Sequence, residues 1–268
     1  MTANYNTISF NTVAPSYNTI NAIPAEAAAD IGRSITALTP IGTPLLDMGC
    51  GAGRIALPAA AAGARIIGVD IEAAMLNEAQ QEARQRQLPL RLVRGTIVQL
   101  PFAEATFAVV LSINVLHLVT EWEQVLHEAV RVLQPGGIFV QGRDWLDPES
   151  CAGRMRSKLR EVVGMLEPSL RPTAAASPVV LGRALEALGG TTEPDTIAGR
   201  WVAAISPAEL LDQMAARTHN ETWMFNDTLL SITLEHLREW ASQTWPDITA
   251  PEPVERRFTL TVTRGLKG

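Results

Sequence analysis

The stretch that decides the fold is LLDMGCGAGR, which runs from Leu45 to Arg54. An apolar run that begins at Pro44 leads into three glycines at every second position, and an alanine-rich stretch follows over Ala52–Ala62. This order is typical of a buried strand that turns directly into a helix. Glycine adopts backbone dihedrals that other residues resist, and it lets the chain approach a ligand closely. The stretch therefore predicts a strand, a ligand-holding turn and a helix that ends at Gly63.

The same alternation continues on both sides of this stretch. Further strands are expected at 65–70, 90–94, 107–112 and 138–142, and further helices at 24–38, 72–86 and 122–133. The strand sequences are continuously apolar, as in IIGVD, which is typical of parallel strands that helices cover on both faces. Pro135, Gly136 and Gly137 predict a turn before the last of these strands. We therefore predict an α/β fold with a doubly wound, mostly parallel sheet of seven strands.

The C-terminal part of the chain departs from this alternation. Helical patterns are expected near 151–166, 178–188, 207–216 and 226–244, with proline-rich turns between them. The stretch RRFTLTVTR, which ends at Arg264, then alternates apolar and polar residues as a strand does. We therefore predict a core over residues 1–143, a helical insertion over 144–253 that caps a substrate, and a final strand within 254–268 that returns to the sheet.

The composition of the chain indicates which kinds of binding partner and which cellular compartment to expect. The chain has 268 residues and a formal net charge of −6, without a run of Lys and Arg, which disfavours binding to nucleic acid. The apolar stretch 55–64 falls short of the roughly 18 residues of a membrane span. The segment MTANYNTISF lacks the pattern of a secretory signal, and two cysteines, Cys50 and Cys151, fit a reducing compartment. We expect a cytoplasmic monomer or homodimer that binds neither nucleic acid nor membrane.

No metal site is expected from the sequence. Glu235 and His236 are adjacent, but no second His or carboxylate follows them at the spacing of metal ligands.

The spacing of the glycines distinguishes between two cofactor classes. The dinucleotide fingerprint is G-x-G-x-x-G, and its third glycine allows close contact between helix and strand. Counted from Gly49, that position is taken by Arg54, whose bulk would obstruct the contact. The actual pattern is G-x-G-x-G, with Asp47 two residues ahead of it. A nicotinamide-dependent oxidoreductase is therefore the less favoured alternative.

The pattern D-x-G-C-G-x-G from Asp47 to Gly53 resembles the first motif of the class I S-adenosylmethionine-dependent methyltransferases. Three further stretches resemble later motifs of that family, and they are IIGVDIEAAML, LVRGTIVQLPFAEATFAVVLS and RVLQPGG. The resemblance extends over Leu45–Val140. It is greatest to the small-molecule branch that includes the enzymes of ubiquinone and menaquinone biosynthesis. It implies the Rossmann-like methyltransferase fold and S-adenosylmethionine as cofactor.

The resemblance also implies roles for individual residues. Asp70 stands where the family has an acid that accepts hydrogen bonds from both ribose hydroxyls. Thr96 replaces the aspartate that commonly bonds the adenine amino group, so its hydroxyl or the backbone of Ile97 would substitute. Ala108 replaces a mainly structural aspartate. The residues expected to border the cofactor are Tyr17, Asp47, Gly49, Cys50, Gly51, Gly53, Asp70, Ile71, Met75, Thr96, Ile97, Ser112 and Asn114.

Several candidate residues also have an interpretation that involves no ligand. In related enzymes an F-x-x-x-A-x-x-Y segment folds over the cofactor as a lid, and Phe10 and Tyr17 match that spacing; the alternative is a solvated tail. Cys50 is expected to be a small packing residue rather than a nucleophile. The tryptophans Trp201 and Trp223 are expected to pack in a core, with a substrate-facing aromatic as the alternative.

His117 is the candidate general base. It follows the fourth strand together with Ser112 and Asn114, where ligands of open α/β sheets bind, and a neutral imidazole can take a proton from a hydroxyl. A histidine at this place also occurs in the family without a catalytic role, and alignment of the acceptor with the methyl group is expected to dominate. The expected reaction is methyl transfer to an O, N or C atom of a small molecule. The alternative is a cofactor-binding module without turnover.

Overall fold

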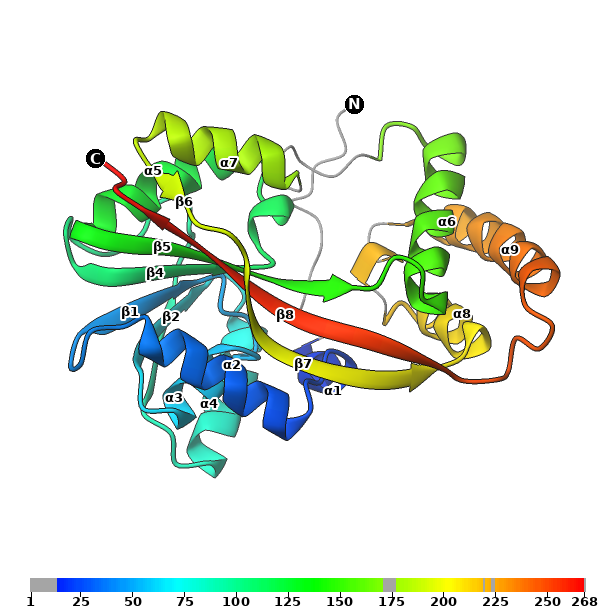
Figure 1. The fold of residues 1–268 in the computed structure, drawn as a ribbon, viewed down its shortest axis with the longest axis horizontal. Coiled ribbons are helices and arrows are strands. Elements are labelled where there is room, and N and C mark those ends of the chain that lie inside the picture. Colours follow the sequence, from blue (N-terminus) through cyan, green and yellow to red (C-terminus); the bar gives the residue numbers. More distant parts are fainter. Residues whose placement is uncertain (1–13, 171–176, 219, 223–224, 268) are drawn as a thin grey trace. The chain divides into compact units, whose positions relative to one another are not determined.

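The computed structural model describes residues 14–170, 177–218, 220–222 and 225–267 (Figure 1). The chain divides into two compact units. Within the described residues, the sheet unit consists of 14–144, 177–199 and 258–267, and the helical unit consists of the remainder between 145 and 257. Among the helices that the model describes, none is long and apolar enough to cross a membrane.

One sheet of eight strands contains all the described strands, in the order β3-β2-β1-β4-β5-β8-β6, with β7 paired to β8 outside that order. Neighbouring strands from β3 to β5 are parallel, and β6 pairs antiparallel with β8. The strands are β1 (Pro44–Met48), β2 (Arg65–Asp70), β3 (Leu90–Arg94), β4 (Phe107–Ile113), β5 (Leu133–Leu146), β6 (Thr191–Thr192), β7 (Thr196–Ile205) and β8 (Glu252–Arg264). The predicted α/β fold with a mostly parallel sheet is confirmed.

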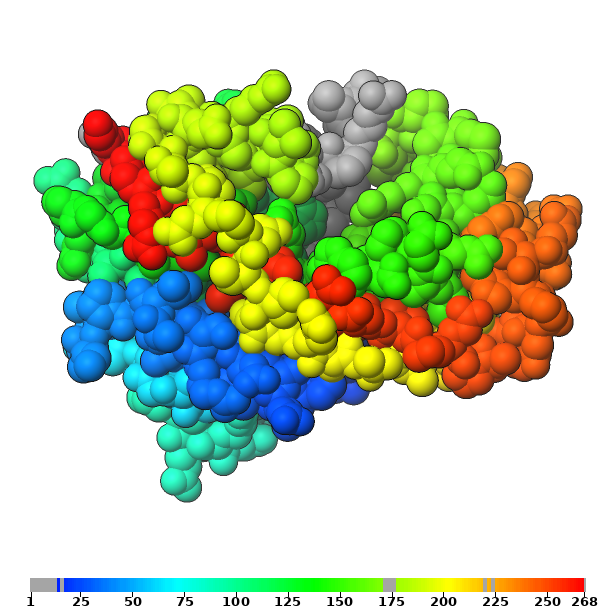
Figure 2. Space-filling model, in the orientation of Figure 1, coloured from blue at the N-terminus to red at the C-terminus, as the bar shows by residue number. Residues whose placement is uncertain are grey.

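The predicted number of seven strands is wrong, because β6 and β7 lie in the segment for which only helices were expected. Exposed and half-buried residues alternate along β7 from Arg200 to Ile205, as they do in a strand with one solvated face. Figure 2 shows β7, in yellow, at the surface. Because apolar residues follow one another along β7, the sequence does not show this alternation.

The helices follow the expected order. They are α1 (Ala14–Ile20), α2 (Ala25–Ala37), α3 (Ala56–Ala61), α4 (Ala73–Gln85), α5 (Trp122–Val132), α6 (Cys151–Leu166), α7 (Pro178–Ala187), α8 (Pro207–Ala215) and α9 (Asp227–Thr244), with short 3-10 turns η2 (Leu116–Leu118) and η4 (Asn220–Thr222). Within the sheet unit, α2, α3 and α4 lie on one face of the sheet and α5 and α7 on the other (Figure 1). This is the doubly wound arrangement.

Two local predictions need correction. Helix α3 begins at Ala56 rather than Ala52, because Gly51 and Gly53 have φ values of +52° and +79°, which a right-handed helix does not allow. The expected turn at 135–137 is a bulge inside β5 instead. Leu133 pairs with Phe107 and Ile138 pairs with Val109, so four residues of β5 stand opposite one residue of β4.

The core of the sheet unit lies between the sheet and helices α5 and α7. Apolar side chains from successive strands are fully buried there, among them Leu46, Met48, Val110 and Phe139. Helix α5 contributes a continuous buried face, and α7 contributes Leu181 and Leu185. Burial on this scale is the main source of stability for the strands that end at the site.

The predicted boundaries of the insertion differ from the observed units. Helix α7, β6 and the first residues of β7 belong to the sheet unit, because α7 packs on its core and β6 pairs with β8. The helical unit comprises α6, α8 and α9 together with the ends of three strands, and β8 begins at Glu252, before the predicted boundary. Its core contains Cys151, Met155, Leu211, Leu237 and Trp245.

Leu185→Ala tests whether α7 is integral to the sheet unit. The Leu185 side chain is 1% exposed and packs in the sheet core. We expect the substitution to lower the free energy of unfolding by about 2–4 kcal/mol, because it removes buried methyl groups and leaves a cavity. Urea unfolding followed by circular dichroism measures the change. Val179→Ala on the same helix is the control, because Val179 is 64% exposed and should shift stability by less than about 0.5 kcal/mol. Equal effects of the two substitutions would contradict the assignment.

Candidate functional site

The candidate site lies at the carboxyl edge of the parallel strands. Strand β1 ends at Met48, β2 at Asp70 and β4 at Ile113. The registers align these ends, because Met48 pairs with Val69 on one side and with Ser112 on the other. Loops that follow the three strands therefore meet at one edge, where ligands of open α/β sheets bind.

The glycine loop is fastened to β2 through its own N–H groups. Gly49 and Cys50 both donate to the carbonyl oxygen of Val69, at 2.8 and 3.1 Å. Gly51 donates to Oδ2 of Asp70 at 2.8 Å, and Gly53 donates to the carbonyl oxygen of Cys50 at 3.0 Å. Three of these N–H groups thus hold the loop on β2, and that of Gly53 closes a turn within the loop.

Glycine is required at the first position of this loop by space as well as by conformation. Gly49 has φ +73°, and a Cβ atom built there would lie 2.5 Å from Cγ2 of Val115. The chain that follows β4 thus approaches the glycine loop closely. At Gly51 the nearest side-chain atom to such a Cβ is Cε of Met75, at 3.7 Å, so Met75 lies beside the loop as predicted for a residue of the site.

The Asp70 carboxylate is the acceptor at the centre of the site. Its Oδ2 accepts from Gly51 and its Oδ1 accepts the N–H of Glu72 at 2.9 Å. Burial raises the pKa of Asp70, and hydrogen bonds from these N–H groups partly oppose that rise. Each oxygen has a further lone pair for a ligand hydroxyl. Next to it, Ile71 is 60% exposed, which leaves an apolar surface beside the carboxylate.

The loop after β3 adjoins Asp70 and carries two more predicted residues. Gly95 donates its N–H to the carbonyl oxygen of Asp70 at 3.0 Å. Thr96 is exposed, and its Oγ1 accepts the N–H of Val98 at 3.2 Å. Ile97 is 8% exposed and packs in the sheet core, so it can meet a ligand only through its backbone.

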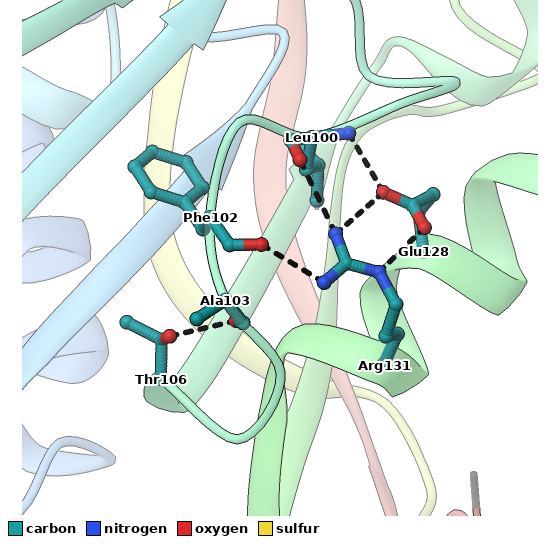
Figure 3. Close-up of polar contacts among 6 residues, drawn as sticks. All are labelled: Leu100, Phe102, Ala103, Thr106, Glu128 and Arg131. Atoms are coloured by element: carbon teal, nitrogen blue, oxygen red, sulfur yellow. Dashed lines mark hydrogen bonds and ion pairs between the residues drawn. The ribbon is translucent and has the colours of Figure 1, made fainter.

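A partly buried ion pair on α5 holds this loop in place (Figure 3). Glu128 accepts the N–H of Leu100 at 2.7 Å and receives two hydrogen bonds from Arg131, at 2.7 and 2.8 Å. Arg131 also donates to the carbonyl oxygens of Phe102 and Leu100, at 2.8 and 3.2 Å. The hydrogen bonds from Arg131 lower the pKa of Glu128, so the pair stays ionised at neutral pH. The loop that presents Thr96 is thereby fixed to the helix behind it.

Two buried polar atoms near the ends of β1 and β4 have no partner in the part of the chain that the structure describes. They are Oδ1 of Asp47, in a side chain that is 2% exposed, and Oγ of Ser112, which is 4% exposed. Burial, with the nearby charge of Asp70 as a smaller cause, raises the pKa of Asp47 to about 7. Buried polar atoms are normally hydrogen-bonded. The two unpartnered oxygen atoms at the edge of the sheet therefore fit a site in which a ligand supplies the missing hydrogen bonds.

Helix α1 packs over the glycine loop. Ala14 is buried against Ala52 and Met75, and Tyr17 packs on the same cluster. Asn18 donates to the carbonyl oxygen of Ala52 at 2.9 Å. Burial raises the pKa of Tyr17, and the charge of Arg54 partly opposes that rise. The position of Tyr17 over the loop supports the lid hypothesis, whereas Phe10 lies outside the described residues.

The sequence interpretation did not assign a site role to Arg54 or recognise its partner, Asp144. Arg54 donates to both carboxylate oxygens of Asp144, at 2.8 and 2.7 Å. Asn114 also donates to Asp144, at 2.8 Å. Asp144 stands near the end of a predicted strand on the same sheet edge, which was the available signal. The bulk of Arg54 served only to argue against a dinucleotide fingerprint, but its charge has a structural role.

The remaining predicted residues are placed as follows. Cys50 directs its thiol toward Gly68, where an added Cβ would lie 2.5 Å from the sulfur, and burial raises the pKa of that thiol well above its usual value. It is therefore an inert packing residue, and its N–H is already engaged. His117 is half-buried in η2, three residues after Asn114.

The helical unit has a polar cluster of its own, in which Arg156 and Arg160 both donate to Glu221. Trp201 is half-buried, and Arg200 pairs with Glu255 at 3.2 Å. Trp223 and His219 lie outside the described residues. His236 contacts the carbonyl oxygen of Ile232 in its own helix. Among the described residues, no group of three or more His, Cys, Asp or Glu side chains could hold a metal ion.

Asp47→Asn tests the buried carboxyl. The folded pKa of about 7 lies above the unfolded value near 4, so between these pH values the folded protein holds a proton that the unfolded chain has lost. Wild-type stability therefore falls as pH rises through this window. We expect the variant to gain free energy of unfolding over the wild type progressively from about pH 5 to pH 7 and the gain to level off above that, as measured by urea unfolding.

Ser112→Ala is the control for this measurement, because it removes the other unpartnered buried atom but does not titrate. Its stability relative to the wild type should be constant over the same pH range. A pH-independent difference for Asp47→Asn would contradict the raised pKa.

Comparison with known proteins finds similarity to methyltransferases in the part of the chain that forms the site. Residues 46–141 match a family model described as a methyltransferase domain. An uncharacterised protein of Mycobacterium tuberculosis is 32% identical over 151 residues, which are 56% of this chain and 54% of that protein. A ubiquinone biosynthesis O-methyltransferase of Cereibacter sphaeroides is 32% identical over 131 residues, 48% of this chain and 53% of that enzyme. The chain thus spans about half the length of the curated relatives it matches.

Solved structures support the fold. Geranyl diphosphate C-methyltransferase from Streptomyces coelicolor, solved with S-adenosyl-L-homocysteine, has a TM-score of 0.52 at 16% identity, covering 90% of this chain and 79% of that one. The [4+2]-cyclase SpnF has a TM-score of 0.59 at 18% identity, covering 97% and 94%. The fold alone thus accommodates more than one activity. The sequence match and the likeness of fold cover the same strands and loops, and residues 46–141 are similar to a methyltransferase domain.

Proposed function

We propose that this protein is an S-adenosylmethionine-dependent methyltransferase that acts on a small molecule. The observation that carries the proposal is the joint between the glycine loop and Asp70, in which Gly51 donates to one carboxylate oxygen. The loop is thereby held against β2 while the carboxylate keeps lone pairs for a ligand. The D-x-G-C-G-x-G order and the family match over 46–141 support the same assignment.

The residues present fit this cofactor. Asp70 would accept the ribose hydroxyls, with Ile71 beside the adenine and Thr96 at its edge. Asp47 offers an unpartnered oxygen to the polar end of the cofactor. The predicted contacts at Gly49, Gly53, Met75, Ser112, Asn114 and Tyr17 border the same edge and belong to the proposal; the contact at Cys50 is limited to its backbone. When bound, S-adenosylmethionine supplies a methyl group already activated by a sulfonium.

The protein's part in the reaction is to align the acceptor with the methyl group and exclude water. We infer that the helical unit caps the substrate, which would enclose a small molecule. The acceptor atom is O, N or C. The Cereibacter relative is named an O-methyltransferase and the Streptomyces structure a C-methyltransferase, so both remain within the proposal. The acidic net charge and two free, buried thiols fit a cytoplasmic monomer or homodimer without a nucleic-acid partner.

Calorimetric titration with S-adenosylmethionine and S-adenosylhomocysteine tests the cofactor. We expect micromolar dissociation constants, or about −8 kcal/mol, for both ligands. Asp70→Ala should lower affinity by at least a hundredfold, because it removes the ribose acceptor and the anchor of the glycine loop. Asp30→Ala is the control, since Asp30 forms an exposed pair with Arg33 on α2.

Three results would separate the alternatives. Binding of NADH instead of the sulfur ligands would favour an oxidoreductase, which the glycine spacing already disfavours. Binding of both sulfur ligands without turnover on a broad panel of phenols, amines and enols would favour a binding module. No binding of either sulfur ligand by the wild type would contradict the proposed function.

His117→Ala separates alignment from general-base catalysis. If alignment dominates, turnover on an acidic acceptor such as a phenol should fall by less than about tenfold, because the acceptor ionises without help. A loss of several orders of magnitude in kcat, with unchanged affinity for S-adenosylhomocysteine, would identify His117 as the base. Leu118→Ala in the same turn η2 controls for local distortion of the loop.

A further inference from the structure

A polar link that begins at Arg54 joins three separate parts of the sheet unit. Its side chain is 15% exposed and makes two parallel hydrogen bonds with the carboxylate of Asp144, which lies on β5. Its Nε also donates to the carbonyl oxygen of Asn21, one residue after α1, at 2.7 Å. One guanidinium at the end of the glycine loop thus binds both β5 and the C-terminal end of α1.

Asp144 extends the link to the chain after β4. Its Oδ2 accepts a hydrogen bond from Nδ2 of Asn114 at 2.8 Å. Asn114 has φ +51°, a left-handed conformation that is uncommon outside glycine and is tolerated best by Asn and Asp. The hydrogen bond fixes the side chain of a residue whose backbone is held in this conformation. The segment that leads to His117 is therefore anchored through the same carboxylate.

Helix α1 has a second anchor on its other side. Asn18 donates to the carbonyl oxygen of Ala52 and to Oε2 of Glu82 on α4, at 2.9 and 3.0 Å. Ahead of the two anchors in the sequence, Ala14 and Tyr17 pack on the glycine loop. Since α1 has only seven residues, its own hydrogen bonds do not hold it as a helix. Its place over the loop depends on these contacts.

The strength of the Arg54–Asp144 pair follows from its geometry. Paired hydrogen bonds between a guanidinium and a carboxylate are short and directional, and partial burial shields them from water. Loss of one partner would leave the other charge partly buried without its ion pair, which is unfavourable. The pair therefore favours one arrangement of α1 and the Asn114 segment over more open ones.

We propose that Arg54 and Asp144 are positioning residues of the cofactor site, whose ion pair holds α1 and the Asn114 segment against the glycine loop. The proposal rests on the proposed function. A ligand on the glycine loop would lie under α1, so α1 must move for it to leave. The pair then controls the rate of cofactor release without contacting the reacting atoms.

Hydrogen exchange and ligand dissociation kinetics test this proposal. The variants are Arg54→Met, which keeps much of the side-chain volume, Asp144→Asn, and the double variant. In the ligand-free variants we expect amides of 14–21 and 113–116 to exchange at least tenfold faster, with α5 and α7 unchanged. The dissociation rate of S-adenosylhomocysteine should rise at least tenfold. The double variant should resemble the single ones, because all three lose the same pair.

Arg143→Met is the matched control. Arg143 precedes Asp144 on β5 and forms an exposed ion pair with Asp195, so the substitution removes a pair from the same strand outside the site. It should change neither exchange at α1 nor ligand release. If Arg54→Met loses stability throughout the protein, Arg54→Lys and Asp144→Asn decide, since Arg54→Lys retains the charge and should give an intermediate rate.

The outcomes separate the two proposals. Exchange of 14–21 within twofold of the wild type in both single variants would overturn the positioning role, whatever the ligand does. Faster exchange without faster release of S-adenosylhomocysteine would overturn the control of release. A wild-type protein that binds neither sulfur ligand would refute the proposed function instead, and exchange in the ligand-free variants would still decide whether the pair holds α1.

Discussion

The hydrogen bond from the Gly51 N–H to the Asp70 carboxylate is the interaction on which the site depends. It joins the loop after β1 to the end of β2, and the carbonyl oxygen of Val69 holds the two preceding residues of the same loop. The loop is therefore shaped before any ligand arrives. This preorganisation lowers the ordering cost of binding, and it leaves the carboxylate partly desolvated, so that ligand hydroxyls would replace little water.

Sequence patterns predicted those parts of the fold that depend on local order. The four helices between 151 and 244 were expected within about one or two residues, because their capping residues and apolar spacing are local properties. Strand β6 has only two residues, and it pairs with β8, which lies about 70 residues later in the chain. Strand β7 also pairs with β8. Both segments are strands because of this distant partner. Propensity does not contain that information.

In the candidate site, too, the sequence predicted residues that lie within one motif and missed contacts between distant segments. Residues within one motif, such as Asp47 and Gly51, were predicted because their spacing is itself the signal. The Arg54–Asp144 pair joins residues 90 positions apart, and the contact of Glu128 with Leu100 joins a helix to a loop 28 positions earlier. Neither residue type is unusual at its position, so only the fold brings these charges together. The acceptors of the N–H groups of Gly49, Cys50 and Gly51 likewise lie on another strand, which the motif itself does not show.

The order of the sheet has a consequence for synthesis of the protein. Strand β8 lies between β5 and β6 and is the last strand to leave the ribosome. Until it has emerged, β5 has one open edge, and β6, already made, has no neighbour within the described sheet. The nascent chain must therefore carry an exposed strand edge through translation of the whole helical unit, and such edges are templates for aggregation. Chaperone dependence should be concentrated in that interval.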